Sequence, residues 1–390
     1  MVRVRTLSSR RMSYLYLILI PPALFLAVTL WNALAWPEVG AGEREGARGA
    51  TEDEPGALSI LIPARDEEKN LAACLDAALA QGAVVGEILI YDDDSSDRTP
   101  AIIEAYARKD ERVRVLQNAR LPAGWCGKNF ACWRLAEAAR SGWMLYLDAD
   151  ARLAPYAAEK MLREARRRRV TLLSCWPALE ARGFWERLLM PMLNFVVFTL
   201  YPAPLSLRRR DASLGLAHGA CLLVERETYF SVGGHSSVRG ELYEDVRLAQ
   251  EWRERGEASL CLDGQRLVRV RMYDSLTEIW RGFQKNFYPA FRRRSSFVGF
   301  MALHLFVFLL PFVAAPLFAS TRAGRMFAAS AALVLLMRAA LAFRFRQAWW
   351  SVALHPLSEA LLIALGLSSW LRCASGRGVS WKGRRYRTAG

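Results

Sequence analysis

The sequence predicts an α/β domain with a mainly parallel sheet, flanked at both ends by helices that cross or lie on a membrane. Three observations lead to this fold class. Short apolar runs alternate with amphipathic stretches between residues 58 and 147, acidic residues follow several of these runs, and long uncharged runs lie near both ends of the chain. A succession of strand, helix and strand with apolar runs of four to six residues is typical of a parallel sheet buried on both faces.

The composition excludes a disordered chain and favours contact with a membrane. Of 390 residues, 53% are hydrophobic and 23% charged, and 53 basic against 38 acidic side chains give a formal charge of +15. Such an excess suits nucleic acid, anionic lipid or a phosphorylated substrate. We predict no nucleic-acid partner, because zinc-finger spacing and aromatic RNA-binding signatures are absent from the sequence, and no obligate protein partner is evident. Basic residues gather beside apolar runs, as anchors to anionic head groups do: Arg3, Arg5, Arg10, Arg11, Arg292 to Arg294, and six residues in 372–390.

The seven cysteines are scattered, with no Cys-x-x-Cys pair and no histidine at zinc-site spacing. A chain of this size builds a core without disulfides, so we predict free thiols in a reducing compartment. We assign them no metal or redox role.

Four apolar runs are candidates for membrane helices: 14–36, 297–319, 326–343 and 349–371. The first would span about 33 Å as a helix, enough to cross a bilayer. The first two runs have no formal charge, whereas the third contains Arg338 and the fourth contains His355, Pro356 and Glu359, which are costly in lipid. A cleaved signal peptide is the alternative for the first run, which is too long for that role and lacks a small-x-small cleavage site before Trp36.

Four spans would conflict with the distribution of charge. With the middle of the chain in the cytoplasm, both basic ends would lie outside, against the positive-inside rule. Pro21-Pro22 provides an alternative, in which the first run enters and leaves the membrane on one face or lies in its interface. The number of spans and the orientation of the termini stay open at this point.

Changes in composition divide the chain into five segments. Residues 38–57 are Gly-rich and acidic with no apolar period, which is typical of a flexible linker. We expect strands at 58–63, 87–91, 113–117 and 144–147, and helices at 64–80 and 129–141. The segments are an N-terminal membrane segment at 1–37, the linker, the α/β domain at 58–295, C-terminal transmembrane helices at 296–372 and a basic tail at 373–390.

Acidic residues follow the expected strands at the edge where ligands of parallel sheets bind. Asp92, Asp93 and Asp94 follow the second strand, where three like charges in a row need hydrogen-bond donors, a cation or solvent. We predict that Asp92 and Asp93 bind a ligand. Residues 97–100, Asp-Arg-Thr-Pro, are instead typical of a cap on the next helix.

Asp148-Ala149-Asp150 follows the fourth strand. Acid-x-acid triplets arise by chance about four times in a chain with this acid content, so the position of the triplet is what indicates function. Directly after a strand, alternate side chains point to one side and can hold one hard cation through oxygen, with open positions for phosphates. We therefore predict Mg²⁺ or Mn²⁺ at this site, where it would neutralise the charge of a departing nucleotide.

Taken in order, PARDEE, YDDDSSDRT, DAD and Glu244-Asp245-Val246 resemble the motifs of the inverting glycosyltransferases of family 2, which have the GT-A fold of nucleotide-diphospho-sugar transferases. The resemblance covers roughly residues 58–290. LPAGWCGKNFA at 121–131 and GFQKNFY at 282–288, with the flanking membrane segments, are most similar to the transferases associated with carotenoid and hopanoid lipids.

On the donor side, the resemblance implies a UDP-linked sugar, whose uracil or ribose Asp92 or Asp93 would hold. Ala64 and Glu67 would line the same pocket. Lys128, in a Gly-Lys turn, would approach the donor, and its alternative is a solvated lysine.

At the reaction centre, Asp148 and Asp150 correspond to the family's DxD motif, which contacts metal and diphosphate. Asp245 corresponds to the catalytic base, which takes the proton of an acceptor hydroxyl as it attacks the anomeric carbon. The alternative is that Glu244 and Asp245 only begin a helix, with acids near its positive end. We favour catalysis, because the glycine-rich stretch 233–240 precedes them as a flexible acceptor-side loop would.

The chain departs from the family at one motif. Processive members carry Gln-x-x-Arg-Trp on an interfacial helix, and here the segment 284–288, Gln-Lys-Asn-Phe-Tyr, keeps the Gln but replaces the Arg and Trp. The difference favours a single transfer over polymer synthesis. We expect Gln284 and Glu244 on the acceptor side, and Lys285 either paired with the donor diphosphate or on the surface as an ordinary lysine.

Residues 184–205 are apolar and aromatic but interrupted by charges and prolines. We expect an interfacial helix in the head-group region, beside Arg208 to Arg210, from which a lipid acceptor would reach Asp245. The alternative is an ordinary buried helix of the domain.

The sequence thus predicts a metal-dependent transferase in the cell (inner) membrane, multi-pass, with the catalytic domain facing the cytoplasm. It would move one sugar from a nucleotide donor to the hydroxyl of a lipid acceptor, an isoprenoid by resemblance. Two alternatives remain: a synthase that glycosylates polyprenyl phosphate, whose anionic acceptor needs no base, and a non-catalytic membrane sensor of nucleotide sugars.

Overall fold

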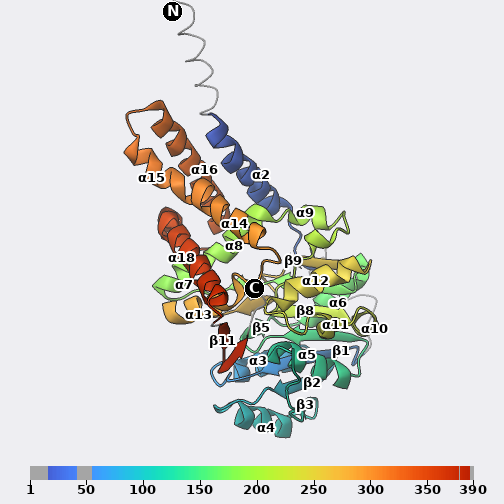
Figure 1. Ribbon diagram of the computed structural model, residues 1–390. Helices are drawn as coiled ribbons and strands as arrows, with labels where there is room; N and C mark the ends of the chain where they lie inside the picture. The colour runs from blue at the N-terminus through green and yellow to red at the C-terminus, as the bar shows by residue number, and fades with distance from the viewer. Residues whose placement is uncertain (1–15, 42–54, 377, 387–390) are drawn as a thin grey trace, which may run out of the picture.

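The computed structural model describes residues 16–41, 55–376 and 378–386. A seven-stranded sheet forms the centre of its α/β domain (Figure 1). The strand order is β3-β2-β1-β4-β8-β6-β9. Pairing is parallel except around β8, which runs antiparallel to β4 and β6, so the expected mainly parallel sheet is confirmed. The strands are β1 Leu58–Ala64, β2 Val85–Asp92, β3 Val113–Leu116, β4 Trp143–Leu147, β6 Leu172–Trp176, β8 Cys221–Glu225 and β9 Ser259–Asp263.

Two smaller sheets accompany the large one. The first has the order β5-β10-β7. Its strand β5 begins at Ala151, directly after the Asp148-x-Asp150 turn. The second is a two-stranded hairpin near the carboxyl terminus. Their strands are β5 Ala151–Leu153, β7 Ala178–Leu179, β10 Val268–Val270, β11 Val379–Trp381 and β12 Arg384–Tyr386.

Helices cover both faces of the large sheet, because alternate residues of its strands are apolar on each side. Ile60 and Ile62 of β1 face one core, which includes helices α3 and α6, whereas Leu61 faces the other, which includes α5 and α12. The domain helices are α3 Leu71–Leu79, α4 Thr99–Lys109, α5 Gly127–Ala138, α6 Ala157–Arg168, η2 Ala212–Leu214, α10 Arg226–Ser231, α11 Gly234–Ser237, α12 Glu244–Glu254 and α13 Leu276–Asn286.

The first expected helix begins later than the sequence predicts. Residues 65–70 form a loop, in which Asp66 has a left-handed backbone (φ 48°) and the carbonyl of Glu67 accepts hydrogen bonds from the N–H groups of Asn70 and Leu71. Only then does α3 start. The loop carries Arg65 and Glu67 to the carboxyl edge of the sheet instead of directing them along a helix.

Within the described residues, four helices are long and apolar enough to cross a membrane. They comprise η1 Tyr16–Leu19 with α2 Ile20–Ala35; α14 Arg294–Leu303 with η3 His304–Leu309 and α15 Leu310–Leu317; α16 Arg322–Arg344; and α18 His355–Ala374. Pro21 and Pro22 lie in the first turn of α2, where proline is tolerated, and the helix continues without a break to Ala35. The first run therefore does not turn back within its described residues, and the re-entrant alternative is wrong for them.

Helix α18 differs from the other three in its position. In Figure 1, α2, α15 and α16 extend away from the sheet, whereas α18 lies beside α7 and α13. The Ser358 hydroxyl near its start donates to the carbonyl of Leu188, and Arg372 at its end donates to the side chain of Gln284. Helix α18 thus contacts the domain from one end to the other, while Leu367 and Leu371 on its outer side are exposed.

The segment 184–205 is not one helix but three: α7 Phe184–Leu189, α8 Pro191–Leu200 and α9 Ala203–Ser206. Their buried aromatic side chains Phe195 and Phe198 join a core that also contains Trp36, Phe308 and Met337 of the apolar helices and their flanks. The chain breaks where Pro191 and Pro202 begin new helical turns. Short α17 Trp350–Ala353 lies between α16 and α18.

The expected linker 38–57 is anchored at its start. Glu38 forms an isolated bridge with Asp263 at the end of β9, and its carboxylate pairs with Arg344 at 3.4 Å. Residues 42–54 of the linker, residues 1–15 and the end of the tail lie outside the described residues. All seven cysteines are buried and form no disulfide, so the prediction of free thiols is confirmed.

Candidate active site

One cavity of about 1490 Å³ collects most of the predicted site residues. Loops at the carboxyl ends of β1, β2 and β4 form one wall, and the starts of α5 and α12 form another. The predicted residues that line it are Ala64, Glu67, Asp93, Lys128, Asp148, Asp150, Glu244, Asp245 and Lys285. Asp92 and Gln284 are not among its lining residues.

Adjacent Asp92 and Asp93 have different surroundings. The Asp92 carboxylate accepts hydrogen bonds from the backbone N–H and hydroxyl of Ser95, and so holds the turn after β2. Asp93 points to the cavity and is 7% exposed. The prediction of a carboxylate that faces a ligand therefore fits Asp93 but not Asp92, which stabilises the turn. The two side chains differ because neighbouring residues at the end of a strand point to opposite sides.

Asp148 and Asp150 lie together between β4 and β5. Burial and the charges of Asp148 and Glu67 raise the pKa of Asp150 to about 7, against the opposing charges of Lys128 and Lys382. The Oδ1 atom of Asp150 is buried without a hydrogen-bond partner. An unpartnered carboxylate oxygen beside a second carboxylate is the chemistry that a hard divalent cation satisfies.

No group of three or more His, Cys, Asp or Glu side chains within residues 16–41, 55–376 and 378–386 is arranged to hold a metal ion. Asp148 and Asp150 therefore fit a cation only as two protein ligands. The remaining coordination positions would belong to water or to phosphate oxygens of a bound nucleotide, which is the usual arrangement for Mg²⁺.

Lys128 connects the two groups of acids. Its Nζ lies 2.9 Å from Oδ1 of Asp148 and 2.9 Å from Oε1 of Glu244. Burial opposes its charge, but Asp148 and Glu244 raise the pKa of Lys128 well above its usual value. The lysine is therefore a paired cation of the cavity wall, with 38% of its side chain exposed.

Asp245 begins α12, as predicted, and its carboxylate is held from two sides. The N–H of Gly219 donates to Oδ2 at 2.7 Å, and the N–H of Val246 donates to Oδ1 at 2.8 Å. Burial and the charge of Glu244 raise the pKa of Asp245 to about 7. A carboxylate with this pKa, fixed in a cavity, can take up a proton near neutral pH.

Gly219 is not predicted as a site residue from the sequence, although little space is left for a side chain at this position. A Cβ there would lie 3.2 Å from Nζ of Lys128 and 3.3 Å from Oδ2 of Asp245. At these distances Lys128 or Asp245 would have to shift by a few tenths of an ångström, so glycine suits the close approach of this backbone N–H to the carboxylate. The Ala-His-Gly-Ala stretch before β8 has no distinguishing pattern in the sequence, so only the fold identifies this donor.

The glycine-rich stretch before Asp245 is not the flexible loop expected from the sequence. Gly233 and Gly234 lie at and in α11, and a Cβ on Gly234 would lie 2.2 Å from the ring of Tyr229. His235 is buried and pairs with the Tyr229 hydroxyl at 2.9 Å. These glycines permit close packing in the core, and the inference of a mobile loop from them is wrong.

Lys285 and Gln284, neighbours on α13, point in different directions. Lys285 lines the cavity, where burial lowers its pKa to about 8. Gln284 instead donates to the Ser368 hydroxyl at 2.9 Å and accepts from Arg372 at 3.2 Å, both on α18. The prediction of an acceptor contact for Gln284 is therefore wrong, because the residue joins α13 to α18.

The basic tail contributes residues that the sequence did not place in the site. Lys382 and Arg384 of the β11–β12 hairpin line the cavity beside Glu67 and Asp93. Their charges led us to expect contact with lipid head groups, because a basic run beside an apolar one is typical of such anchors. For these two residues that expectation is wrong.

The opposite part of the cavity is apolar. It lies between α8, α13, α14 and α18, and we call it the apolar end; the part around Asp93 and Asp148 is the acidic end. Asp245, Glu244 and Lys285 also line the cavity. The apolar end is lined by Met192, Leu193, Val196, Phe287, Phe291, Phe300, Leu361, Leu362 and Leu365.

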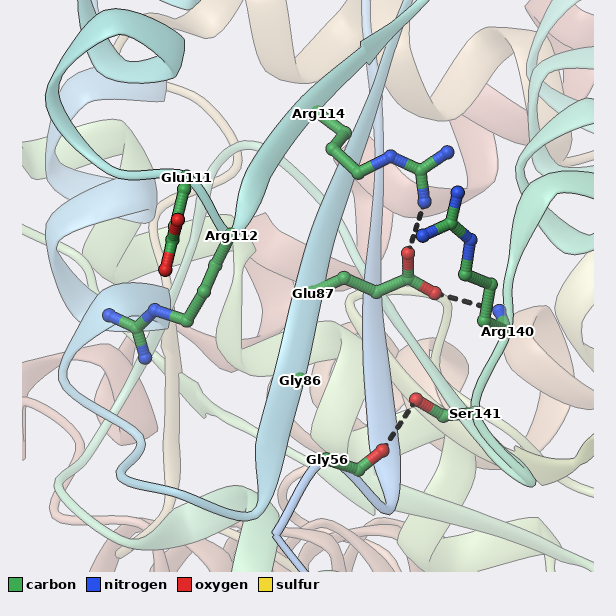
Figure 2. Close-up of a pocket in the computed structure, with 8 residues that line it drawn as sticks. All are labelled: Gly56, Gly86, Glu87, Glu111, Arg112, Arg114, Arg140 and Ser141. Carbon is green, nitrogen blue, oxygen red and sulfur yellow. Dashed lines mark hydrogen bonds and ion pairs between the residues drawn. The ribbon is translucent and has the colours of Figure 1, made fainter.

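A second cavity lies at the amino ends of β1 to β4 (Figure 2). Glu87 at its centre accepts hydrogen bonds from the Ser59 hydroxyl, Arg114 and the backbone N–H of Arg140. These bonds use the carboxylate to join three strands and a loop. We assign this cavity a structural role.

The domain matches known proteins in sequence. Residues 59–230 match the family model described as glycosyl transferase family 2. The chain is 29% identical over 221 residues to a 4,4'-diaponeurosporenoate glycosyltransferase of Staphylococcus haemolyticus, covering 56% of this chain and 57% of that protein. A protein of the same name from Staphylococcus aureus is 28% identical over 235 residues, covering 57% and 60%. The match thus spans about six tenths of these curated relatives.

The fold also matches a solved structure. A mannosyltransferase from Pyrobaculum calidifontis, in complex with GDP-Man and Mn²⁺, aligns with a TM-score of 0.52 at 16% identity, covering 91% of this chain and 99% of that one. The match supports the expected GT-A fold. The chain thus carries, at residues 59–230, a domain that matches the glycosyl transferase family 2 model.

Proposed function

We propose that this protein is a membrane-bound inverting glycosyltransferase that moves one sugar from a nucleotide-diphospho-sugar to the hydroxyl of an apolar lipid. The observation that carries the proposal is the single cavity with an acidic end, an apolar end and Asp245 in its wall. The apolar end lies between two helices of the domain, α8 and α13, and two that belong to segments long enough to span a membrane, α14 and α18, which suits an acceptor that comes from the bilayer.

The acidic end suits the nucleotide donor. Asp148 and Asp150, with the unpartnered Oδ1 of Asp150, would hold Mg²⁺ or Mn²⁺, whose chemistry is to neutralise charge on the diphosphate. Asp93, at the end of β2, suits the nucleoside, as the family resemblance implies. The solved mannosyltransferase of the same fold was obtained with GDP-Man and Mn²⁺, which supports a nucleotide sugar here but does not choose between uracil and guanine.

Asp245 is proposed as the base. A hydroxyl becomes a useful nucleophile only when a proton acceptor lies within reach, and a carboxylate with a pKa of about 7 is suited to that task. Gly219 and Val246 fix its orientation through their N–H groups. Lys128 would remain beside Asp148 and Glu244, where its charge offsets theirs.

The apolar end suits the acceptor. Its aromatic and leucine side chains offer no hydrogen bonds, so they favour a hydrocarbon chain over a sugar polymer. The absence of the processive Arg and Trp after Gln284 agrees with a single transfer. The names of the curated relatives contain a carotenoid carboxylate, diaponeurosporenoate, so they support a carotenoid-type acceptor and make a carotenoid carboxylate, beside a hydroxylated carotenoid, one of the first acceptors to test.

The position of α18 supports a particular arrangement in the membrane. We propose that α2, α14 with α15, and α16 cross the bilayer, and that α18 lies at its surface with Leu367 and Leu371 in lipid. The domain and the end of α18 would then share the cytoplasmic face. This removes the conflict with the positive-inside rule for the basic tail.

The test is turnover by the protein purified in detergent. UDP- and GDP-sugars are supplied with Mn²⁺, with a hydroxylated carotenoid or with polyprenyl phosphate as acceptor, and the lipid product is identified by mass spectrometry. We expect transfer to the hydroxyl and its loss in Asp245→Asn. Transfer to polyprenyl phosphate that survives in Asp245→Asn would favour the synthase, and nucleotide binding without any transfer would favour the sensor.

A further inference from the structure

The carboxyl-terminal hairpin β11–β12 lies on the acidic end of the cavity, although about 300 residues separate it from its partners along the chain. Figure 1 shows β11 below the end of α18, and β11 contacts both α18 and α13. The hairpin turn, Lys382-Gly383, and the following Arg384 line the cavity with Glu67 and Asp93. The hairpin is thus a wall of the site and not a peripheral tail.

Lys382 and Arg384 of the hairpin each have a specific partner. Lys382 lies with Nζ 2.5 Å from Oε1 of Glu67 and also donates to the carbonyl of Arg65. Arg65 returns a hydrogen bond from Nε to the Lys382 carbonyl at 2.9 Å. Arg384 forms an ion pair with Oδ2 of Asp93. The hairpin is therefore bonded to the loops after both β1 and β2.

The start of α5 is shaped to admit the hairpin. The N–H of Gly127 donates to the Tyr386 hydroxyl at 3.3 Å. A Cβ on Gly127 would lie 2.2 Å from Nη1 of Arg384 and 2.5 Å from Oδ2 of Asp93. Any side chain at 127 would therefore push the arginine and the carboxylate apart.

The acidic end needs cations to accept a nucleoside diphosphate. Glu67, Asp93, Asp148 and Asp150 all line it, and a diphosphate adds further negative charge. Lys128 is shared between Asp148 and Glu244. Lys382 is only 22% exposed in its side chain and lines the same cavity as Asp148 and Asp150, so its ammonium faces the part of the cavity where the diphosphate is expected.

We propose that the hairpin completes the donor pocket, with Lys382 binding the diphosphate and Arg384 positioning Asp93 for the nucleoside. This inference rests on the proposed function and names donor-site residues beyond the family's motifs. When the donor binds, Lys382 gives up part of its contact with Glu67 and binds oxygens of the diphosphate. A phosphate group with two negative charges binds an ammonium group more strongly than a single carboxylate does. Arg384 acts through Asp93 and is a positioning residue.

The experiment measures nucleotide affinity by calorimetry with the full-length protein, using UDP, GDP and the matching monophosphates, each with Mn²⁺. We expect Lys382→Gln to weaken the diphosphate about tenfold, the size of one charge-assisted hydrogen bond, with a smaller effect on the monophosphate. Arg384→Gln should weaken both about equally, and Arg384→Lys should restore part of the loss. Arg108→Gln, an exposed cation of α4, is the charge control.

Two further variants test the hairpin as a unit. A chain shortened to end at Gly376 should lose as much affinity for UDP or GDP as Lys382→Gln and Arg384→Gln cause together. A chain that ends at Tyr386 should bind these nucleotides as tightly as the full chain does. Gly127→Ala keeps every hairpin charge but should weaken binding by displacing Arg384. Thermal unfolding of each variant separates loss of affinity from loss of fold.

The outcomes are distinct. Equal loss for diphosphate and monophosphate in Lys382→Gln would overturn its assignment to the diphosphate. Tighter binding by the shortened chain would mean that the hairpin blocks the pocket, which also overturns the proposal. If the full chain binds neither UDP nor GDP, the proposed function itself fails; if it binds them and the hairpin variants bind equally well, only the present inference fails.

Discussion

Compared with the wild type, Asp245→Asn should have a larger free energy of unfolding at pH 8 but not at pH 5. The same substitution should abolish turnover. Burial and Glu244 raise the pKa of Asp245 from 3.8 to about 7. Below pH 3.8 the carboxyl is protonated in both folded and unfolded chains. As the pH rises to 7, the unfolded chain ionises first, so this group lowers the free energy of unfolding progressively and the full cost is present above pH 7.

The magnitude follows from the separation of the two pKa values. About 3 pH units correspond to about 4 kcal/mol for complete burial, and water in the cavity reduces this to about 2 kcal/mol. Asparagine keeps one of the two backbone hydrogen bonds to Asp245, and the lost bond costs about 1 kcal/mol. We therefore expect a net gain of about 1 kcal/mol at pH 8, or about 1 °C in Tm for a chain of 390 residues, and no gain at pH 5.

The assay is thermal unfolding in detergent, followed by tryptophan fluorescence at both pH values. Glu186→Gln is the control of opposite sign. Despite its burial, Arg271 and the N–H groups of Arg182 and Gly183 lower the pKa of Glu186, so its charged form stabilises the fold and its loss should lower Tm at both pH values. If Asp245→Asn lowers Tm equally at pH 5 and pH 8, Asp245 only caps α12 and the argument for a poised base is refuted.

Three other predictions concern the same machinery. In the wild-type protein kcat/KM should rise with pH through about 7 as Asp245 loses its proton, and a flat profile from pH 6 to 8 would contradict this. Asp150→Asn should abolish the increase in nucleotide affinity that Mn²⁺ causes, measured by calorimetry; an unchanged Mn²⁺ effect would exclude Asp150 as a ligand. Gly366→Val should lower Tm by several degrees, because a Cβ there would lie 2.8 Å from both the Phe287 ring and the sulfur of Met301, whereas Gly299→Val, which has open space, should not.

Residues near strand ends were predictable because their positions depend on local pattern. The apolar runs of β1, β2 and β4 are visible in the sequence, and parallel pairing brings their carboxyl ends to one edge. Asp93 and Asp150 therefore share a cavity, as expected. The distinction between Asp92 and Asp93 needed the exact end of β2, since a shift of one residue exchanges the two faces of a strand.

Gln284 and the 233–240 stretch show where motif reasoning failed. The helical spacing that presents Lys285 to the cavity turns Gln284 toward α18, and only the position of α18 determines which neighbour faces the site. Glycine is used both in mobile loops and in tight packing. Gly234 belongs to the second kind because the Tyr229 ring occupies the space where its Cβ would be.

The sequence alone determined the α/β class, the four apolar helices and the acids at the sheet edge, because periodicity and strand ends are properties of neighbouring residues. Only the tertiary structure decided that α18 lies along the domain and that Lys382 and Arg384 meet Glu67 and Asp93. Lysine and arginine pair equally well with lipid phosphates and with carboxylates. Their partners are therefore chosen by where the chain returns in space, for which residues about 300 positions apart leave no local pattern.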